Sequence, residues 1–127
     1  MRIDHIAIWT NDIEALREFY VNLFDFKSGE RYENPTKGYA SYFLTYETGA
    51  RLEIMSRTDI QHRPDDGPHL GYAHFSIALG SEEQVLDMAK RVEEYGCVIN
   101  DGPRTTGDGY FEFATKDPDG NVIEVMA

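Results

Sequence analysis

An internal repeat constrains the fold of this 127-residue chain more than any other feature of its sequence. Three residues of segment 49–55 recur in the same order in segment 120–126, each of them 71 positions later (120 − 49, 124 − 53 and 126 − 55). They are Gly49, Glu53 and Met55 in the first copy and Gly120, Glu124 and Met126 in the second. A constant offset through a small chain indicates a duplicated module. We therefore expect two similar halves.

The first half contains one strand-like segment, one helical segment and a hairpin. Residues 2–9 alternate and are rich in β-branched types, which predicts a strand. Apolar residues at helical spacing from Ile13 to Phe24 predict an amphipathic helix. Segments 39–46 and 50–56 predict a hairpin, and the polar segment 30–37, broken by an Asn-Pro pair, is expected to be an irregular loop.

The second half begins in the same way. Residues 72–79 alternate like a strand. Ser81 and Gln84 then form a capping-box pattern, which predicts the start of a helix. The apolar stripe expected on that helix consists of Val85, Met88, Val92 and Tyr95.

The end of the second half repeats the hairpin. Residues 97–99 predict a short strand, and the glycine-containing segment 100–108 predicts a flexible loop. Segments 110–115 and 121–126 predict a hairpin whose turn is the Asp-Pro-Asp-Gly sequence at 117–120.

Strand, helix and three further strands in each half predict an α+β fold of two tandem βαβββ modules. A helix is expected to cover one face of each sheet. The modules are expected at 1–57 and 71–127, with the polar segment 58–70 as the linker between them. The length of the chain suits a single domain built from both modules.

The charge of the chain argues against two classes of partner. A net charge of −11 repels phosphate backbones and anionic lipids, so we expect neither a nucleic-acid partner nor a membrane partner. No apolar run approaches the roughly 18 residues that span a bilayer, and the first residues lack a secretory signal pattern. A single cysteine excludes an intrachain disulfide and fits a cytoplasmic protein.

Two histidines and the two repeated glutamates form the candidate site. Each is flanked by a strongly apolar residue of a predicted strand, so the alternation places all four on the sheet face opposite the helices. The four are His5, Glu53, His74 and Glu124. A glutamate on the solvent face of a strand is common, and a single strand histidine is more often a surface or core residue than a ligand. The equivalent places of the four in the two halves favour a shared metal site.

The donor set defines the kind of metal ion but not its identity. Two imidazole nitrogens and two carboxylate oxygens suit a divalent nickel, zinc, cobalt, manganese or iron ion. The four residues can share one ion only if the two modules pair face to face. That pairing is possible within one chain or between two chains of a symmetric dimer.

Three other residues with reactive or ligating side chains are not part of the repeat. His62 and His69 belong to the linker segment and are expected on the surface. Cys97 begins a predicted strand and is expected to be buried packing, because no sequence signature pairs it with a histidine.

The sequence resembles the vicinal oxygen chelate superfamily, and within it glyoxalase I most closely. The resemblance rests on paired βαβββ modules that each open on a histidine and close on a glutamate. Its specific marks are segments 4–8, 19–20, 71–77 and 117–124. It implies the glyoxalase/bleomycin-resistance/dihydroxybiphenyl dioxygenase-like fold. Glutamate at position 53 resembles glyoxalase I rather than methylmalonyl-CoA epimerase, which typically has glutamine there.

The resemblance implies a metal-dependent lyase or isomerase. Such an enzyme converts the hemithioacetal of a 2-oxoaldehyde and a thiol to a 2-hydroxy thioester. The metal acts as a Lewis acid, and a carboxylate transfers the proton through a metal-bound enediolate. By this resemblance Glu124 is the base, and Glu53 holds the metal or serves the opposite face of the substrate. The family also implies a homodimer with the site across its interface.

The sequence departs from glyoxalase I where that family binds glutathione. The family typically has arginine four residues after the first histidine, and this chain has Trp9. Met55 and Arg57 stand where the family typically has threonine and asparagine. We therefore expect another thiol or substrate to be possible. The small-molecule contacts predicted for the site are Trp9, Met55, Arg57, Arg104 and Met126.

Two alternative functions share the same fold. One is a binding protein that sequesters an antibiotic or another small molecule, with or without a metal. The other is an iron-dependent dioxygenase. The second glutamate argues against the dioxygenase, because oxygen chemistry needs open coordination positions for the substrate and O₂.

Overall fold

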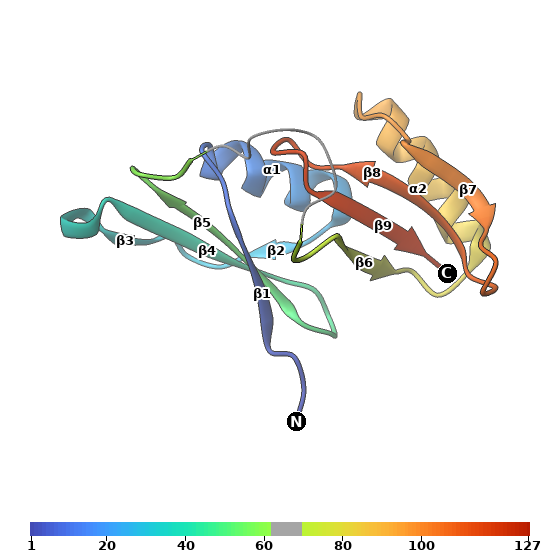
Figure 1. Ribbon diagram of the computed structural model, residues 1–127, viewed down its shortest axis with the longest axis horizontal. Coiled ribbons are helices and arrows are strands. Elements are labelled where there is room, and N and C mark those ends of the chain that lie inside the picture. The colour runs from blue at the N-terminus through green and yellow to red at the C-terminus, as the bar shows by residue number, and fades with distance from the viewer. Residues whose placement is uncertain (62–69) are drawn as a thin grey trace. The chain divides into compact units, whose positions relative to one another are not determined.

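The computed structural model describes residues 1–61 and 70–127, which form two compact units that divide between residues 64 and 65 (Figure 1). Most of the expected linker 58–70, including His62 and His69, lies outside the described residues. The joining of the two modules into one domain stays a prediction. Each unit combines one long helix with one sheet, and the predicted α+β class is confirmed.

The first unit contains one α-helix and a five-stranded sheet in the order β1-β5-β4-β2, with β3 paired to β4. Its elements are β1 (His5–Trp9), α1 (Ile13–Phe24), β2 (Lys27–Ser28), β3 (Tyr32–Asn34), the 3₁₀ helix η1 (Pro35–Lys37), β4 (Tyr39–Thr45) and β5 (Arg51–Arg57). Strand β1 runs parallel to β5, whereas β4 and β5 form the predicted antiparallel hairpin.

Helix α1 follows the predicted pattern. It begins where the Asp12 carboxylate accepts a hydrogen bond from the backbone N–H of Ala15, at 3.0 Å. It ends at Asp25, which adopts the left-handed conformation. The buried stripe of the helix consists of Ile13, Leu16, Phe19, Tyr20, Leu23 and Phe24. These side chains pack the helix on β4 and β5 and form the core of the first unit.

A polar cluster also joins α1 to the sheet. The Glu14 carboxylate accepts a hydrogen bond from the Tyr42 hydroxyl at 2.8 Å, from Arg17 Nε at 3.0 Å and from Arg31 Nη1 at 2.6 Å. The hydrogen bond from Tyr42 is the main cause that lowers the pKa of Glu14 below its ordinary value.

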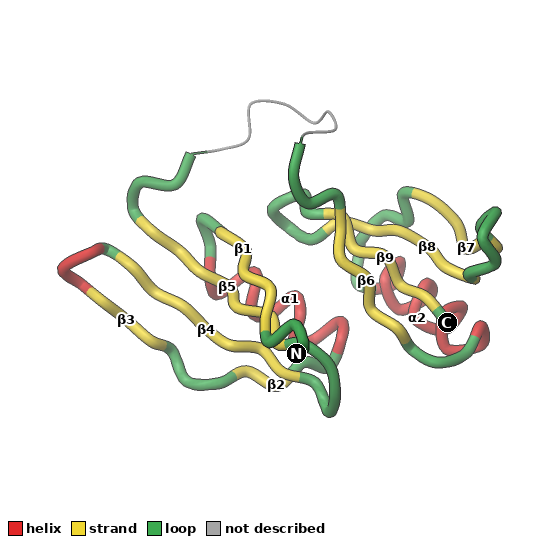
Figure 2. Tube along the Cα trace, turned by 60° about the horizontal axis from the view of Figure 1, so that its bottom comes forward, coloured by secondary structure: helices red, strands yellow, loops and turns green. Residues whose placement is uncertain are grey.

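The second unit contains one helix and a four-stranded sheet in the order β6-β9-β8-β7 (Figure 2). Its elements are β6 (His74–Ala78), α2 (Glu82–Glu94), β7 (Asp101–Thr105), β8 (Phe111–Lys116) and β9 (Val122–Met126). Strand β6 runs parallel to β9, as β1 does to β5 in the first unit. The same topology in both units agrees with the duplication inferred from the sequence.

The capping box of α2 is present, but the predicted stripe is partly wrong. The Ser81 hydroxyl accepts a hydrogen bond from the backbone N–H of Gln84 at 3.3 Å. The buried residues of α2 are Val85, Ala89 and Val92. Tyr95 was predicted to be in the stripe but is 45% exposed. It is the C-cap residue, one position beyond the end of the helix at Glu94.

Two segments predicted to be irregular are ordered. Residues 30–37 contain β3 and η1, because β3 pairs with β4 and the Asn34 side chain caps the short helix. The strand predicted at 97–99 is wrong, and β7 occupies 101–105 instead. Gly102 allows β7 to pair closely with β8, because its φ is +83° and an added Cβ would lie 2.6 Å from the carbonyl oxygen of Glu112. Cys97 therefore lies outside a strand and is half-buried.

The predicted alternation of faces is present in both sheets. Leu52 and Ile54 of β5 are buried, whereas Glu53 between them is not. Ile123 and Val125 of β9 are likewise fully buried on either side of Glu124. Each sheet therefore has one face packed under its helix and a second, polar face.

Candidate metal-binding and substrate site

The first His–Glu pair is held between two neighbouring parallel strands. His5 Nε2 of β1 lies 3.8 Å from Glu53 Oε2 of β5. The Tyr39 hydroxyl of β4 donates a hydrogen bond to Glu53 Oε1 at 3.2 Å. The Glu53 side chain is only 14% exposed, so this carboxylate is largely shielded from water and fixed by its neighbours.

Asp4 orients the histidine of this pair and was not predicted as a site residue. His5 Nδ1 lies 3.0 Å from Asp4 Oδ2, and Arg51 binds the same carboxylate. The hydrogen bond to His5, followed by that to Arg51, lowers the pKa of Asp4 to about 2. A carboxylate on one ring nitrogen leaves the other nitrogen free to bind a ligand, as is common behind metal-binding histidines. Its position next to His5 was the available sequence signal.

The second His–Glu pair has closer contacts. His74 Nε2 of β6 lies 3.0 Å from Glu124 Oε2 of β9. The Ser76 hydroxyl donates a hydrogen bond to the same oxygen at 3.0 Å. Ser76 stands directly opposite Glu124 in the register of β6 and β9, where the first module has Ala7 opposite Glu53. The two modules therefore hold their glutamates with different hydroxyl groups.

Glu112 adds a carboxylate to the polar face of the second sheet, and it was also missed. It lies opposite Met126 in the register of β8 and β9, on the same face as Glu124. Burial, and then the negative charge of Glu124, raises the pKa of Glu112 above its ordinary value. The equivalent position of the first module is Ser41, so a search for repeated residues passes over Glu112.

The donor chemistry of the two pairs fits a divalent metal ion. Each pair contributes one imidazole nitrogen and one carboxylate oxygen from adjacent strands, which are ordinary ligands for such ions. Among residues 1–61 and 70–127, no group of three or more His, Cys, Asp or Glu side chains is gathered as a metal cluster. A four-residue site therefore needs both pairs, and their convergence on one ion stays a prediction.

Three of the predicted substrate contacts lie together at one end of the first sheet. Trp9 and Met55 are directly opposite in the register of β1 and β5. The Arg57 guanidinium lies over the Trp9 ring, 5.7 Å from its centroid. Arg57 also forms an ion pair with Asp59, with Nη2 2.6 Å from Oδ2. The positive charge of Arg57 is therefore already matched by an anion.

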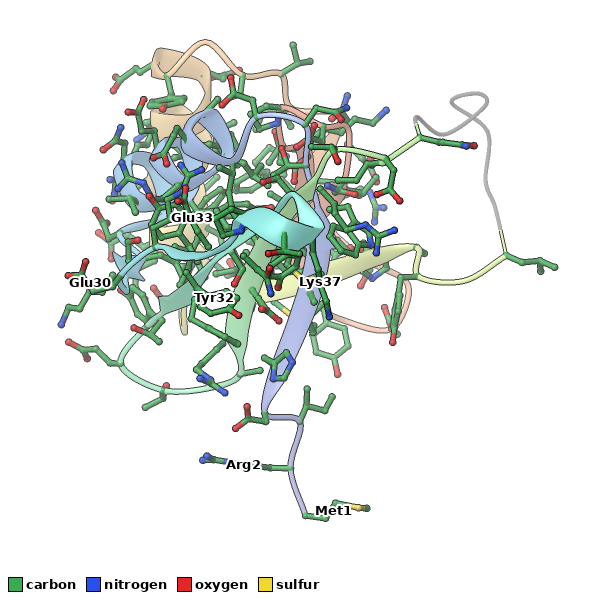
Figure 3. All side chains as sticks on the ribbon, turned by 90° about the vertical axis from the view of Figure 1, so that its left-hand side faces the viewer. Met1, Arg2, Glu30, Tyr32, Glu33 and Lys37 are labelled. Atoms are coloured by element: carbon green, nitrogen blue, oxygen red, sulfur yellow. The ribbon has the colours of Figure 1, made fainter. Side chains whose placement is uncertain are left out.

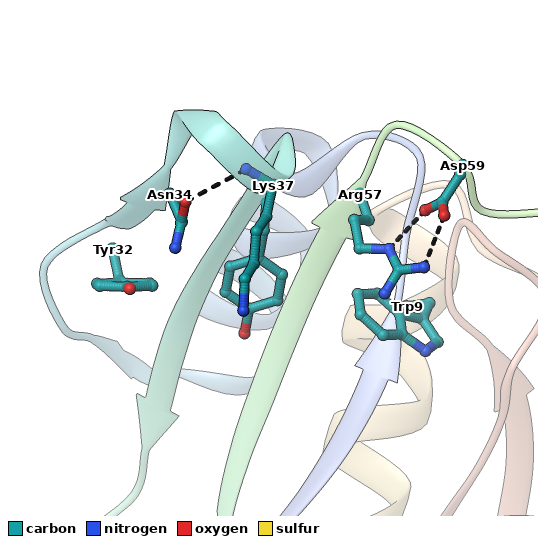
Figure 4. A pocket seen from close by; sticks show the side chains of 7 residues that line it. Trp9, Tyr32, Asn34, Lys37, Arg57 and Asp59 are labelled. Atoms are coloured by element: carbon teal, nitrogen blue, oxygen red, sulfur yellow. Dashed lines mark hydrogen bonds and ion pairs between the residues drawn. The ribbon is translucent and has the colours of Figure 1, made fainter.

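A pocket of about 580 Å³ opens beside these residues (Figure 4). It is lined by Trp9, Tyr32, Asn34, Lys37, Tyr39, Arg57 and Asp59. This volume lies within the usual range for small-molecule sites. Tyr32, Asn34 and Lys37 come from the segment predicted to be an irregular loop, so the sequence interpretation placed no site there.

The two remaining predicted substrate contacts belong to the second sheet. Arg104 lies opposite Glu112 in the register of β7 and β8, and its Nε donates to Asp101 Oδ2 at 3.0 Å. Met126 is half-buried at the end of β9. Both residues are close to Glu112 in the strand register, but Arg104 is paired locally with an aspartate, as Arg57 is.

Paired modules with this strand order, each with a His–Glu pair on its polar face, define a recognisable class of α+β protein. The family model of the Glyoxalase/Bleomycin resistance protein/Dioxygenase superfamily matches residues 2–125. The chain belongs to this superfamily, which confirms the resemblance seen in the sequence.

One curated relative and two solved structures of similar fold illustrate the similarity. The uncharacterized protein YwbC of Bacillus subtilis (strain 168) is 30% identical over 123 residues, which cover 97% of this chain and 94% of that protein. The trypanothione-dependent glyoxalase I of Leishmania major is similar in fold, with a TM-score of 0.78 and 20% identity over 99% of this chain and 86% of that one. Glyoxalase I from Zea mays gives a TM-score of 0.82 and 23% identity over 98% of this chain and 44% of that one.

Across residues 1–61 and 70–127, no helix is both long and apolar enough to cross a bilayer.

Proposed function

We propose that this chain is a metal-dependent lyase of the glyoxalase I type. Its substrate class is the hemithioacetal of a 2-oxoaldehyde and a low-molecular-weight thiol, or a related compound with two adjacent oxygens. The observation that carries this proposal is the repeated His–Glu pair, on equivalent strands of two modules, in a chain of this superfamily.

In this proposal His5, Glu53, His74 and Glu124 hold a divalent ion. When bound, the ion supplies Lewis-acid polarisation of the two adjacent substrate oxygens. The two modules face each other either within one chain or, as we favour, across a homodimer. Asp4 keeps Nε2 of His5 directed at Glu53, which supports its part in the ligand set.

The two glutamates have different roles. Glu124 takes the proton from the carbon next to the substrate carbonyl and returns it to the neighbouring carbon. Glu53 remains a ligand, because the Tyr39 hydroxyl holds it and it is the less exposed of the two, at 14% against 23% for Glu124. Trp9, Met55 and Arg57 contact the rest of the substrate from the first module. Arg104 and Met126 do so from the second.

The test compares Glu124→Gln with Glu83→Gln, an exposed change on α2 of the same module. Metal content is measured by elemental analysis after loading with nickel, cobalt or zinc. Turnover is measured with methylglyoxal and either glutathione or other thiols. We expect Glu124→Gln to lose at least about a hundredfold in turnover while it keeps most of its metal, because a general base contributes roughly 10²–10⁴-fold. Glu83→Gln should match the unmutated protein.

Two results would overturn this proposal. One is an unmutated protein that takes up less than about 0.3 ions per chain, well below even one ion for two chains. The other is a Glu124→Gln variant with unchanged turnover.

A sequestering protein is the second candidate, and the pocket of about 580 Å³ within the first module favours it. Such a protein binds its ligand without chemical change. It predicts the same ligand affinity in Glu124→Gln and in unmutated protein, together with no turnover of any thiol and 2-oxoaldehyde pair. Direct binding measurements beside the turnover assay separate the two candidates.

A further inference from the structure

The pocket of the first module is built mainly by three aromatic rings. Tyr39 stands between the other two, with its ring centroid 6.3 Å from that of Trp9 and 6.0 Å from that of Tyr32. Trp9 and Tyr32 are 44% and 56% exposed, so part of each ring remains accessible although Arg57 lies over that of Trp9. Aromatic faces at such spacing offer edge and stacking contacts to a further planar ring.

The charges around the rings are unequal. Arg57 and Asp59 neutralise each other through a two-bonded ion pair. Lys37 lines the pocket with an extended side chain (Figure 4). Within residues 1–61 the Lys37 ammonium group forms neither an ion pair nor a hydrogen bond to a side chain. In this part of the chain the pocket thus has a cation without an anion.

The backbone fixes Lys37 and Tyr32 at this place. The backbone N–H of Lys37 donates to the Asn34 side chain at 3.2 Å, and this bond closes η1. Tyr32 is held by the pairing of β3 with β4. Figure 3 shows both side chains on this edge of the first unit, apart from the N-terminal residues Met1 and Arg2. The pocket therefore rests on ordered elements.

We propose that this pocket binds an aromatic carboxylate. The ring system lies among Trp9, Tyr32 and Tyr39, and the carboxylate pairs with Lys37. The volume of about 580 Å³ leaves room for more than one ring. The Lys37 ammonium group beside the three aromatic rings favours a planar aromatic anion. A neutral aromatic ring lacks the charge, and a non-aromatic acid lacks the ring.

The pocket is connected to the candidate metal ligands by one side chain. The Tyr39 ring lines the pocket, and its hydroxyl binds Glu53. An occupant of the pocket therefore lies next to the proposed catalytic centre. The aromatic acid would then be one end of the enzyme's substrate, and this part of the inference rests on the proposed function. The binding of the acid to the pocket does not.

The experiment uses 2-naphthoate as the probe and the full chain without added metal or thiol. Trp9 is the only tryptophan, so its indole N–H gives one assignable resonance in a ¹H–¹⁵N spectrum, and this nucleus reports from inside the pocket. The comparison ligands are 2-naphthylmethanol, which lacks the charge, and cyclohexanecarboxylate, which lacks the aromatic ring. The variants are Lys37→Met, Tyr32→Leu and the control Lys27→Met, an exposed lysine of β2 outside the pocket.

We expect 2-naphthoate to shift the indole resonance saturably and to bind more tightly than either comparison ligand. Lys37→Met should weaken its binding about tenfold, which equals about 1.4 kcal/mol, and should leave 2-naphthylmethanol unaffected. Tyr32→Leu should weaken both aromatic ligands. Lys27→Met should bind as the unmutated protein does. Binding of 2-naphthoate should also weaken as salt is added.

Equal affinity of Lys37→Met and Lys27→Met for 2-naphthoate would overturn the assignment of the carboxylate to Lys37. No movement of the indole resonance at millimolar 2-naphthoate would overturn the site as a whole. The failure of this inference is distinguishable from that of the proposed function, because metal uptake and turnover are measured on the same protein without any aromatic acid.

Discussion

The replacement Ser76→Ala tests how the second module prepares Glu124 for a metal ion. It removes the hydroxyl that donates to Glu124 Oε2 at 3.0 Å and leaves the backbone pairing of β6 and β9 in place. A hydrogen bond to a charged group is worth about 1.5–3 kcal/mol. The Glu124 side chain is 23% exposed, so water replaces part of this bond and the lower end applies. About 1.4 kcal/mol corresponds to a tenfold loss of metal affinity.

The assay is a calorimetric titration of metal-free protein with zinc, together with kcat/KM for any substrate found by the thiol screen. Ser76→Thr keeps the hydroxyl and should keep the affinity of the unmutated protein. The matched control is Ala7→Ser, because Ala7 faces Glu53 in the same register. The new serine hydroxyl would face the Glu53 carboxylate, which already accepts a hydrogen bond from Tyr39. The affinity for zinc should therefore change less than about threefold.

The reasoning is refuted if folded Ser76→Ala binds zinc within twofold of the unmutated protein. It is also refuted if Ser76→Thr loses as much affinity as Ser76→Ala. In that case the size of the side chain, rather than the hydrogen bond, would be responsible.

Two further predictions concern the framework of the first module. Gly38→Ala should lower the free energy of urea unfolding by about 2 kcal/mol and should weaken the binding of 2-naphthoate, because φ is +55° and the new Cβ would lie 2.8 Å from a threonine hydroxyl oxygen. The control is Gly49→Ala, where φ is +93° and no atom lies within 4 Å of the new Cβ. It should lose only the stability that comes from the strained backbone. Glu14→Gln should cost about 0.5–1 kcal/mol at pH 7, and much less at pH 3.5. The pKa of Glu14 in the folded protein lies below the unfolded value of 4.5, chiefly because the Tyr42 hydroxyl donates to it. The stabilisation by Glu14 is therefore present above pH 4.5 and is lost as the pH falls through the folded pKa. Urea unfolding at both pH values checks this, with the exposed change Glu18→Gln as the control.

The sequence was sufficient for those parts of the fold that depend on periodicity and on repetition. The helix Ile13–Phe24 begins and ends as predicted because its cap, stripe and stop signals agree with one another. The equivalent helix in the second module was predicted from its capping box, but Tyr95 was misplaced in the stripe. Periodicity alone does not fix the residue at which a helix ends.

The errors fall where pairing partners, rather than local residues, decide the structure. Gly102 and Pro103 are typical of a loop, yet β7 crosses them as an edge strand with an irregular register beside β8. Segment 30–37 likewise looked irregular because its short strand is stabilised by β4 and not by its own propensity. This second error concealed the pocket, since Tyr32 and Lys37 belong to that segment.

The candidate site divides in the same way. Repetition pointed to the two His–Glu pairs because duplication preserves their positions. It did not point to Asp4 or Glu112, which have no counterpart of the same type in the other module, where Ala73 and Ser41 stand. These two residues are each specific to one module. They become visible only when the strand register places them beside a repeated pair.

The side chains around the two repeated glutamates differ, and this difference supports the separate roles that we propose for Glu53 and Glu124. In the first module Tyr39 both binds Glu53 and lines the pocket, so one side chain connects a candidate metal ligand with the proposed ligand pocket. In the second module Ser76 and His74 both contact Glu124 within about 3 Å. A carboxylate fixed beside a pocket suits a ligand that holds the ion in place. A more exposed carboxylate beside a hydroxyl, as Glu124 is, suits proton transfer, because the Ser76 hydroxyl can donate to it before it takes a proton and accept from it afterwards. The unequal surroundings, more than the repeat itself, therefore support our proposal that Glu124 is the base.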